Sequence, residues 1–222
     1  GLVYGGQGRR KGALLQPGNI VRAEWKGRLS DSLGHFTLEI EKASAASVMD
    51  DRLALAGLTA ACSIAGACLP ERESHFRAYA AMKILLANFE NIEIWPALMA
   101  RWELGLLSEL GFGLTLDRCA ATGARDQLIY VSPRSACAVS ADAGGAYKDK
   151  LLGLPPFLRG EGSGATLAEA VEGLKTTGYF IETRILHLAN KPLPEPRARM
   201  IELLGALAAG VAATSDSAIS LP

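Results

Sequence analysis

The chain has 222 residues, of which 49% are hydrophobic, 21% charged and 6% aromatic. This length allows a sizeable core in one or two domains, and the apolar content excludes a wholly disordered chain. Four cysteines are too few for a disulfide scaffold, and the sequence shows no basic-then-apolar leader with a cleavage site. We therefore expect a cytosolic protein with reduced thiols.

Charge is unevenly distributed, although 23 basic residues balance 23 acidic ones. The first 28 residues contain six Lys or Arg and a single acid, Glu24, so the remainder is net negative. A basic end on a neutral chain favours an anionic partner that binds at this end over non-specific binding by the whole protein.

Residues 1–42 are typical of β structure. The runs 20–25 and 36–41 alternate apolar with polar residues, which is the period of a half-buried strand. Two or three strands do not make a stable domain alone, and the apolar residues begin at Leu2 with no initiator Met. We expect the sequence to start inside a sheet whose first strands are missing.

After Lys42 the pattern becomes helical. The predicted helices cover residues 46–68, 74–90, 95–110, 166–176, 178–188 and 195–213. The uncharged stretch 53–69 is at the lower edge of the length that spans a bilayer, but its many Ala, Gly and Cys residues favour a buried core helix. Residues 215–222 are expected to fray.

Residues 5–12, Gly-Gly-Gln-Gly-Arg-Arg-Lys-Gly, form the most informative segment. Glycines let a backbone approach a ligand closely, and the adjacent Arg9, Arg10 and Lys11 attract phosphate. The segment is not a P-loop, because no Gly-Lys-Ser/Thr ends it and no strand–loop–helix context follows. Two interpretations remain, a solvated loop and a loop that grips a nucleic-acid backbone.

Cations on the next predicted strand favour the nucleic-acid interpretation. Arg22 and Lys26 are four residues apart and share a face, and Arg28 follows two residues later on the same face. Trp25 points the opposite way and is expected in the core. Phe36 is a candidate for base stacking, but a core position is the favoured interpretation.

Residues 117–147 interrupt the helices and predict a small β insert, with short runs at 128–131 and 136–139. Two cysteines and two hydroxyl residues occupy the spacing of a four-ligand zinc site, here called the knuckle positions: Cys119, Thr122, Cys137 and Ser140. Structural zinc requires four thiolate or imidazole ligands, and hydroxyls are poor replacements. We expect no metal, with the insert held by its own small core and hydrogen bonds.

The sequence predicts no catalytic residues and no cofactor. His35, His75 and His187 are isolated in sequence and lie outside metal or nucleophile signatures, so a structural role is the favoured interpretation for each. A nucleophile elbow, an Asp-rich metal box and a dinucleotide fingerprint are all missing from the sequence.

Several strings, taken together, resemble the RecO family of recombination mediators. They occupy residues 5–11, 15–18, 69–75, 102–113, 116–119 with 122–123, and 154–157. Each string is weak alone, but their order and spacing are specific, and the similarity covers nearly the whole chain.

The resemblance implies a multi-domain α+β protein. An N-terminal OB-fold β-barrel, incomplete because its first strands are missing, would cover 1–42. A mainly helical C-terminal domain would cover 43–222 and include 117–147 as a zinc-finger-like insert. Many members carry four cysteines there, and this chain departs at Thr122 and Ser140, so it looks like a member that dispensed with the metal.

The resemblance also implies a non-enzymatic role in the RecF pathway of DNA repair, in the bacterial cytoplasm at the nucleoid and not at a membrane. Family members bind single- and double-stranded DNA, anneal complementary strands, pair with RecR and help to load RecA. They also bind the acidic C-terminal tail of single-stranded-DNA-binding protein. The basic loop carries the DNA role onto Arg9, Arg10 and Lys11, and Arg101 resembles a cation that holds the acidic tail. The alternative is a helical protein-interaction scaffold with no DNA binding of its own.

Overall fold

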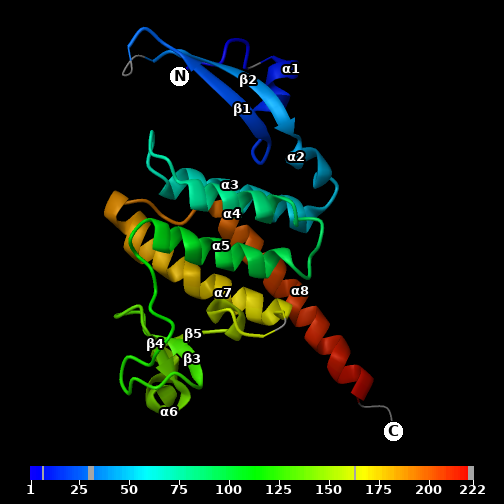
Figure 1. Ribbon diagram of the computed structural model, residues 1–222. Helices are drawn as coiled ribbons and strands as arrows, with labels where there is room; N and C mark the ends of the chain where they lie inside the picture. The colour runs from blue at the N-terminus through cyan, green and yellow to red at the C-terminus, as the bar shows by residue number, and fades with distance from the viewer. Residues whose placement is uncertain (7, 30–32, 163, 220–222) are drawn as a thin grey trace.

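The computed structural model describes residues 1–6, 8–29, 33–162 and 164–219, with the backbone alone described for 9–11 and 212–219. Figure 1 shows three levels along the molecule, which are a small sheet near the N-terminus, a layer of helices and a second small sheet at the far end. The mixed α and β composition predicted from the sequence is confirmed.

The helices are α1 (Arg9–Leu14), α2 (Ser44–Ser47), α3 (Arg52–Cys68), α4 (Phe76–Leu86), α5 (Trp95–Glu109), α6 (Ala141–Gly144), α7 (Leu167–Phe180) and α8 (Glu195–Ile219). The strands are β1 (Ile20–Lys26), β2 (His35–Lys42), β3 (Leu128–Val131), β4 (Ala138–Ser140) and β5 (Leu152–Gly153). Short 3-10 helices cover Gly145–Lys150 (η1), Pro156–Arg159 (η2) and His187–Ala189 (η4), and a π-helix covers Ile181–Leu186 (η3).

The N-terminal sheet is an antiparallel hairpin of β1 and β2, so both predicted strands are confirmed. Among the described residues this sheet is open and closes no barrel. Trp25 lies opposite Phe36 and is 37% exposed, so the prediction that it is in the core is wrong. The reason is that a two-stranded sheet has too few neighbours to cover its apolar face.

The first predicted helix, 46–68, is two helices, because α2 ends at Ser47 and α3 begins at Arg52. Asp51 marks the second start, since its Oδ1 accepts hydrogen bonds from the backbone amides of Leu53 and Ala54 at 2.8 and 3.0 Å. A capping carboxylate satisfies amides that have no partner inside a helix. As predicted, α3 is a core helix, with Leu58 and Ile64 fully buried.

The helices α3, α5, α7 and α8 pack around this core, and α8 extends beyond the helical layer at its C-terminal end (Figure 1). No helix in the described part of the chain has both the length and the hydropathy to cross a membrane. The backbone of α8 continues to Ile219, past the predicted end at 213 and through most of the segment expected to fray. Residues 220–222 lie outside the described residues.

The predicted helices 166–176 and 178–188 are one continuous helical segment, because α7 runs directly into η3. Thr166 and Glu169 form a capping box at its start, with the Thr166 amide donating to Glu169 Oε2 at 2.8 Å. Gly178 lies inside this helical segment. A larger residue does not fit there, because a Cβ at this position would collide with the guanidinium of Arg197 on α8. The glycine therefore serves a close contact and does not break the helix.

Candidate nucleic-acid and partner interfaces

The sequence suggested that the basic segment near the N-terminus is a loop. In the structure only its first part is a loop. A left-handed Gly5 leads through Gly8 into α1, which begins at Arg9. The residues Arg-Arg-Lys and Ala-Leu of α1 have good helix propensity, and this outweighs the cost of Gly12 inside the helix. The side chains of Arg9, Arg10 and Lys11, and all of residue 7, lie outside what the structure describes, so their DNA contacts stay a prediction.

The predicted cationic face of β1 carries acids as well. Arg22 Nε lies 3.4 Å from Glu41 Oε1, and Lys26 Nζ lies 3.4 Å from Glu24 Oε1. Glu39 stands directly opposite Arg22 in the hairpin register. Exposed ion pairs of this kind contribute about 1 kcal/mol or less to stability, so a phosphate can replace the carboxylate partners. With its acids included, this face alone is not strongly positive.

The tip of the hairpin brings predicted and unpredicted residues together. Lys26 and Arg28 line a hollow of about 540 Å³ with Tyr4 and His35. The rings of Tyr4 and His35 lie 5.4 Å apart between centroids and are tilted by 52°, and Tyr4 is 65% exposed. Cations beside exposed rings can hold phosphates and stack bases, so this hollow is the candidate nucleic-acid site.

Arg101 lies on the exposed side of α5, at the rim of a groove of about 330 Å³ between α5 and the segment after η2. The apolar part of its lining consists of Ile94, Ala97, Leu98, Phe157 and Ala165. Glu93 and Glu161 also border it, but Glu161 is bound to Arg159 at 2.9 Å. An apolar groove with a cation at its rim suits a peptide that ends in an apolar residue and a carboxylate.

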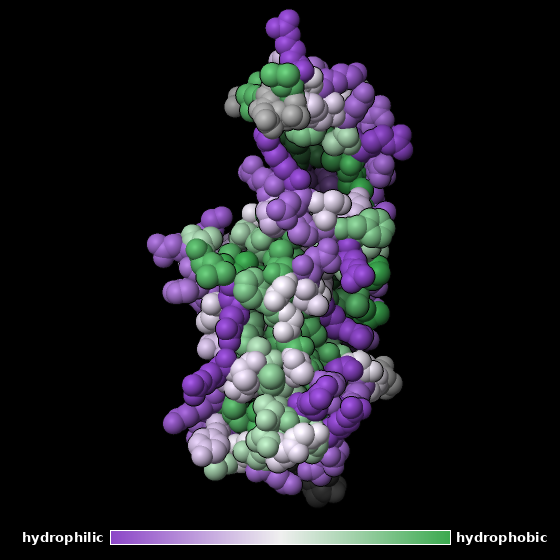
Figure 2. Space-filling view, turned by 60° about the vertical axis from the view of Figure 1, so that its left-hand side comes forward, coloured by the Kyte–Doolittle hydropathy of each residue, from purple (hydrophilic) through white to green (hydrophobic). Residues whose placement is uncertain are grey.

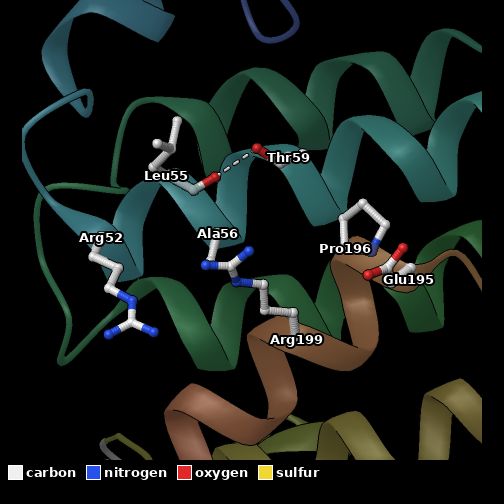
Figure 3. A pocket seen from close by; sticks show the side chains of 7 residues that line it. All are labelled: Arg52, Leu55, Ala56, Thr59, Glu195, Pro196 and Arg199. Carbon is white, nitrogen blue, oxygen red and sulfur yellow. Dashed lines mark hydrogen bonds between the residues drawn. The ribbon is translucent and has the colours of Figure 1, made fainter.

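A further hollow of about 330 Å³ lies between α3 and α8 (Figure 3). Its lining includes Arg52 from α3, and Glu195 and Arg199 from α8. Figure 3 shows the Arg199 side chain extending from α8 toward α3. The Thr59 hydroxyl donates to the carbonyl of Leu55 at 2.7 Å, so this hydroxyl is engaged with its own helix. The lining offers charge but no nucleophile paired with a base.

Three of the knuckle positions, Cys119, Thr122 and Ser140, come together at the second sheet, whose strand order is β4-β3-β5, whereas Cys137 Sγ donates to the carbonyl of Ser135 at 3.3 Å. Cys119 Sγ accepts hydrogen bonds from the Ser140 amide at 3.3 Å and from Ser140 Oγ at 3.5 Å. Burial raises the pKa of the Cys119 thiol, but hydrogen bonds from Ser140 and Thr122 outweigh burial and lower the pKa to about 6. These hydrogen bonds therefore favour the thiolate form of Cys119.

These residues do not fit the zinc ion that the family resemblance implies. Thr122 Oγ1 accepts from the Ala124 amide at 3.3 Å, and the Ser140 hydroxyl is directed at Cys119. Only Cys119 and Cys137 are zinc ligands by type, and structural zinc takes four. Within the described ranges no group of three or more His, Cys, Asp or Glu side chains is placed to hold a metal ion.

Glu103 and Arg197 form a buried ion pair that sequence reasoning missed. Arg197 Nε and Nη2 lie 2.7 and 2.8 Å from the two carboxylate oxygens. Thr177 Oγ1 donates to the same carboxylate at 2.5 Å, and Arg197 also donates to the Leu174 carbonyl at 2.5 Å. The pair joins α5, α7 and α8, and it is a fixed structural connection because its polar atoms are directed at one another.

Comparison with known proteins agrees with the family resemblance seen in the sequence. A family model described as recombination protein O C terminal matches residues 49–194. The chain is 48% identical over 203 residues to a DNA repair protein RecO of Roseobacter denitrificans, covering 91% of this chain and 84% of the relative. It is 47% identical over 202 residues to one from Caulobacter vibrioides, covering 91% and 83%. These matches place the chain among DNA repair and recombination proteins.

A third relative, from Methylorubrum extorquens, is 47% identical over 209 residues, which cover 91% of this chain and 85% of that DNA repair protein RecO. The chain belongs to the RecO family, as its sequence strings predicted.

Proposed function

We propose that this chain is a non-enzymatic recombination mediator of the RecF pathway. It binds single- and double-stranded DNA, anneals complementary strands and, with RecR, helps to load RecA on DNA coated by single-stranded-DNA-binding protein. The observation that carries the DNA role is the hairpin-tip hollow, where Lys26 and Arg28 lie beside the rings of Tyr4 and His35. The relatives' names, DNA repair protein RecO, support the pathway.

Annealing follows from this arrangement without bond chemistry. Two DNA strands repel each other through their phosphates, and a protein that neutralises phosphates on both strands lowers that barrier. Ring stacking is tolerant of base sequence, so one surface serves any complementary pair. The proposal therefore includes no catalytic residue, no nucleotide hydrolysis and no cofactor, and it places the protein at the nucleoid in the bacterial cytoplasm.

The β1–β2 hairpin is, in this proposal, part of an OB-fold. OB-folds bind oligonucleotides on a strand surface, and the cations of β1 lie on one face of the hairpin. Arg9, Arg10 and Lys11 extend this surface at the start of the chain.

The groove beside Arg101 is proposed as the site for the acidic tail of single-stranded-DNA-binding protein. The tail's apolar end would contact Leu98 and Phe157, and its carboxylate would bind Arg101. A tail peptide that binds the protein while full-length protein ignores DNA would favour the alternative, a protein-interaction scaffold.

The test is equilibrium binding of a fluorescent single-stranded oligonucleotide across a range of salt concentrations. The variant R9A/R10A/K11A is expected to bind more weakly, and its slope of log affinity against log salt should fall by about 2, because each phosphate contact contributes about 0.7. The matched control is K148A/K150A, whose exposed cations lie on η1 beside the second sheet. Equal affinity and slope for wild type and R9A/R10A/K11A would contradict the role of these three cations, and a wild type that binds no oligonucleotide would contradict the proposal.

A further inference from the structure

The outward face of α4 carries an exposed row of two aromatic rings and a cation, here called the α4 ridge: Phe76, Tyr79 and Lys83. Phe76 is 76% exposed and Tyr79 is 51% exposed. Lys83 Nζ lies 5.8 Å from the centre of the Tyr79 ring. The opposite face of the helix is in the core, with Ala78 and Leu85 buried. The ridge is therefore a surface feature and not part of the packing.

The ridge stands on a fixed support. Trp102 of α5 donates its indole N–H to the carbonyl of Ala78 at 3.2 Å, and this buried bond ties α4 to α5. Leu85 and Phe89 anchor the other end of the segment in the core. Rigid aromatic groups lose little conformational freedom when a ligand covers them, so the support favours binding at the ridge.

The charges on α4 favour an anionic ligand. The sequence of α4 contains two cations, Arg77 and Lys83, and no acid. Two carboxylates, Glu73 and Glu109, lie at the N-terminal end of α4 beside His75, at 3.8 and 3.7 Å from its ring nitrogens. An anionic backbone is therefore expected to run along the Lys83 side of the ridge, away from those acids.

Spacing fits neighbouring bases of one strand. Residues 76 and 79 are three apart on a helix, which is about 4.5 Å along its axis. This is slightly more than the roughly 3.4 Å between bases of a stacked strand. A strand that is slightly stretched can place one base on each ring, and base–aromatic stacking is independent of sequence.

We propose that the α4 ridge is a second contact site for single-stranded DNA, on the helical domain and separate from the hairpin-tip hollow. Two successive bases stack on Phe76 and Tyr79, and Lys83 binds the phosphate that accompanies them. The inference rests on the proposed function, because it assigns the helical domain a share of DNA binding.

A protein partner is the other class of ligand that exposed rings can take. The observations favour DNA, because lysine is depleted at protein interfaces and Lys83 lies within the ridge over a ring. A base can stack on a ring that has a cation beside it, since the cation meets the phosphate.

The experiment compares wild type with F76L/Y79L, which keeps apolar side chains but removes both rings. Because both positions are exposed, the variant is expected to fold normally, and thermal unfolding checks this. Affinity for a single-stranded oligonucleotide should fall roughly five- to twentyfold, while affinity for the duplex of the same sequence should change less than twofold. I84A is the matched control, since Ile84 is 59% exposed on the same helix.

A second arm uses an oligonucleotide whose central nucleotides lack bases. Wild type should bind it about as weakly as F76L/Y79L binds the intact strand, and K83Q should reduce the salt slope by about 0.7. Unchanged affinity of F76L/Y79L for the intact strand overturns the inference while leaving the proposed function standing. The inference is also overturned if F76L/Y79L loses binding to a protein partner but keeps its affinity for the strand. A wild type that binds no DNA overturns both the inference and the proposed function.

Discussion

Cys119 illustrates how two hydroxyl residues change the chemistry of a four-position knuckle. In a zinc site the thiolate would donate to the metal, whereas here it accepts hydrogen bonds from Ser140. The spacing Cys-x2-Thr and Cys-x2-Ser was sufficient to predict the missing ligands. It was not sufficient to predict the thiolate, because the Ser140 contacts depend on how β4 packs on the Cys119 turn.

The thiolate makes stability depend on pH at this residue. Its pKa is lowered to about 6 in the folded protein, so the folded thiol ionises before the unfolded one and stability rises with pH between about 6 and 9. This contribution is fully present above about pH 9, the ordinary thiol pKa, and is lost as pH falls to about 6. Urea unfolding of wild type should therefore lose more stability between pH 9 and pH 6 than C119S does. Parallel curves for the two proteins would refute the thiolate.

Two substitutions should restore a metal site at the same place. T122C/S140C supplies four thiols at the spacing that zinc takes. We expect about one zinc per chain in this variant and none held by wild type, as measured by metal analysis of protein dialysed against excess zinc. Tightly bound zinc in wild type would show that the knuckle works with two hydroxyls after all.

At the scale of elements, alternation and helical spacing located β1, β2 and the core helices. Local patterns did not show that Asp51 starts a new helix or that Gly178 continues one, because each depends on a contact made by folding. The sequence shows Glu39 and Glu41 as alternate residues of β2. Only the hairpin register reveals that Glu39 lies opposite Arg22 and that Glu41 lies beside Arg22. Tyr4 was missed because a lone aromatic near the start of a chain carries no spacing signal.

The junction of α5, α7 and α8 depends on the Glu103–Arg197 pair. E103Q leaves the Arg197 charge buried with only part of its partner, which is expected to cost about 3 kcal/mol or more of unfolding free energy. E103Q/R197M removes both charges and should recover part of that loss. Urea denaturation measures each variant. If E103Q unfolds like wild type, the pair does not hold these helices together.

For the whole molecule, Figure 2 shows hydrophilic and apolar side chains mixed over the end that holds β1 and β2, and a run of apolar side chains over the helical layer with hydrophilic ones along its edges. The apolar run suits the proposed division of labour, in which the helical layer offers apolar contacts to a peptide while cations of the N-terminal end bind phosphates. The family could be predicted from strings spread along the chain. The arrangement of its surfaces could not, because it joins residues from distant segments.

The groove beside Arg101 gives a prediction at this scale. R101E should weaken binding of a peptide with an acidic C-terminal tail by about tenfold or more, because it places a like charge against the tail carboxylate. It should leave single-stranded DNA affinity within about twofold. Calorimetry with the peptide measures the first and fluorescence anisotropy the second. Normal peptide binding by R101E would place the tail elsewhere.

The central claim is that cations near the start of the chain neutralise the phosphates of two DNA strands at once. Annealing of complementary oligonucleotides without ATP, at low and moderate salt, tests this most directly. The account predicts that wild type and K148A/K150A accelerate annealing, that R9A/R10A/K11A does so far less, and that salt suppresses the acceleration. Annealing by wild type no faster than the spontaneous rate, or undiminished by R9A/R10A/K11A, would contradict it.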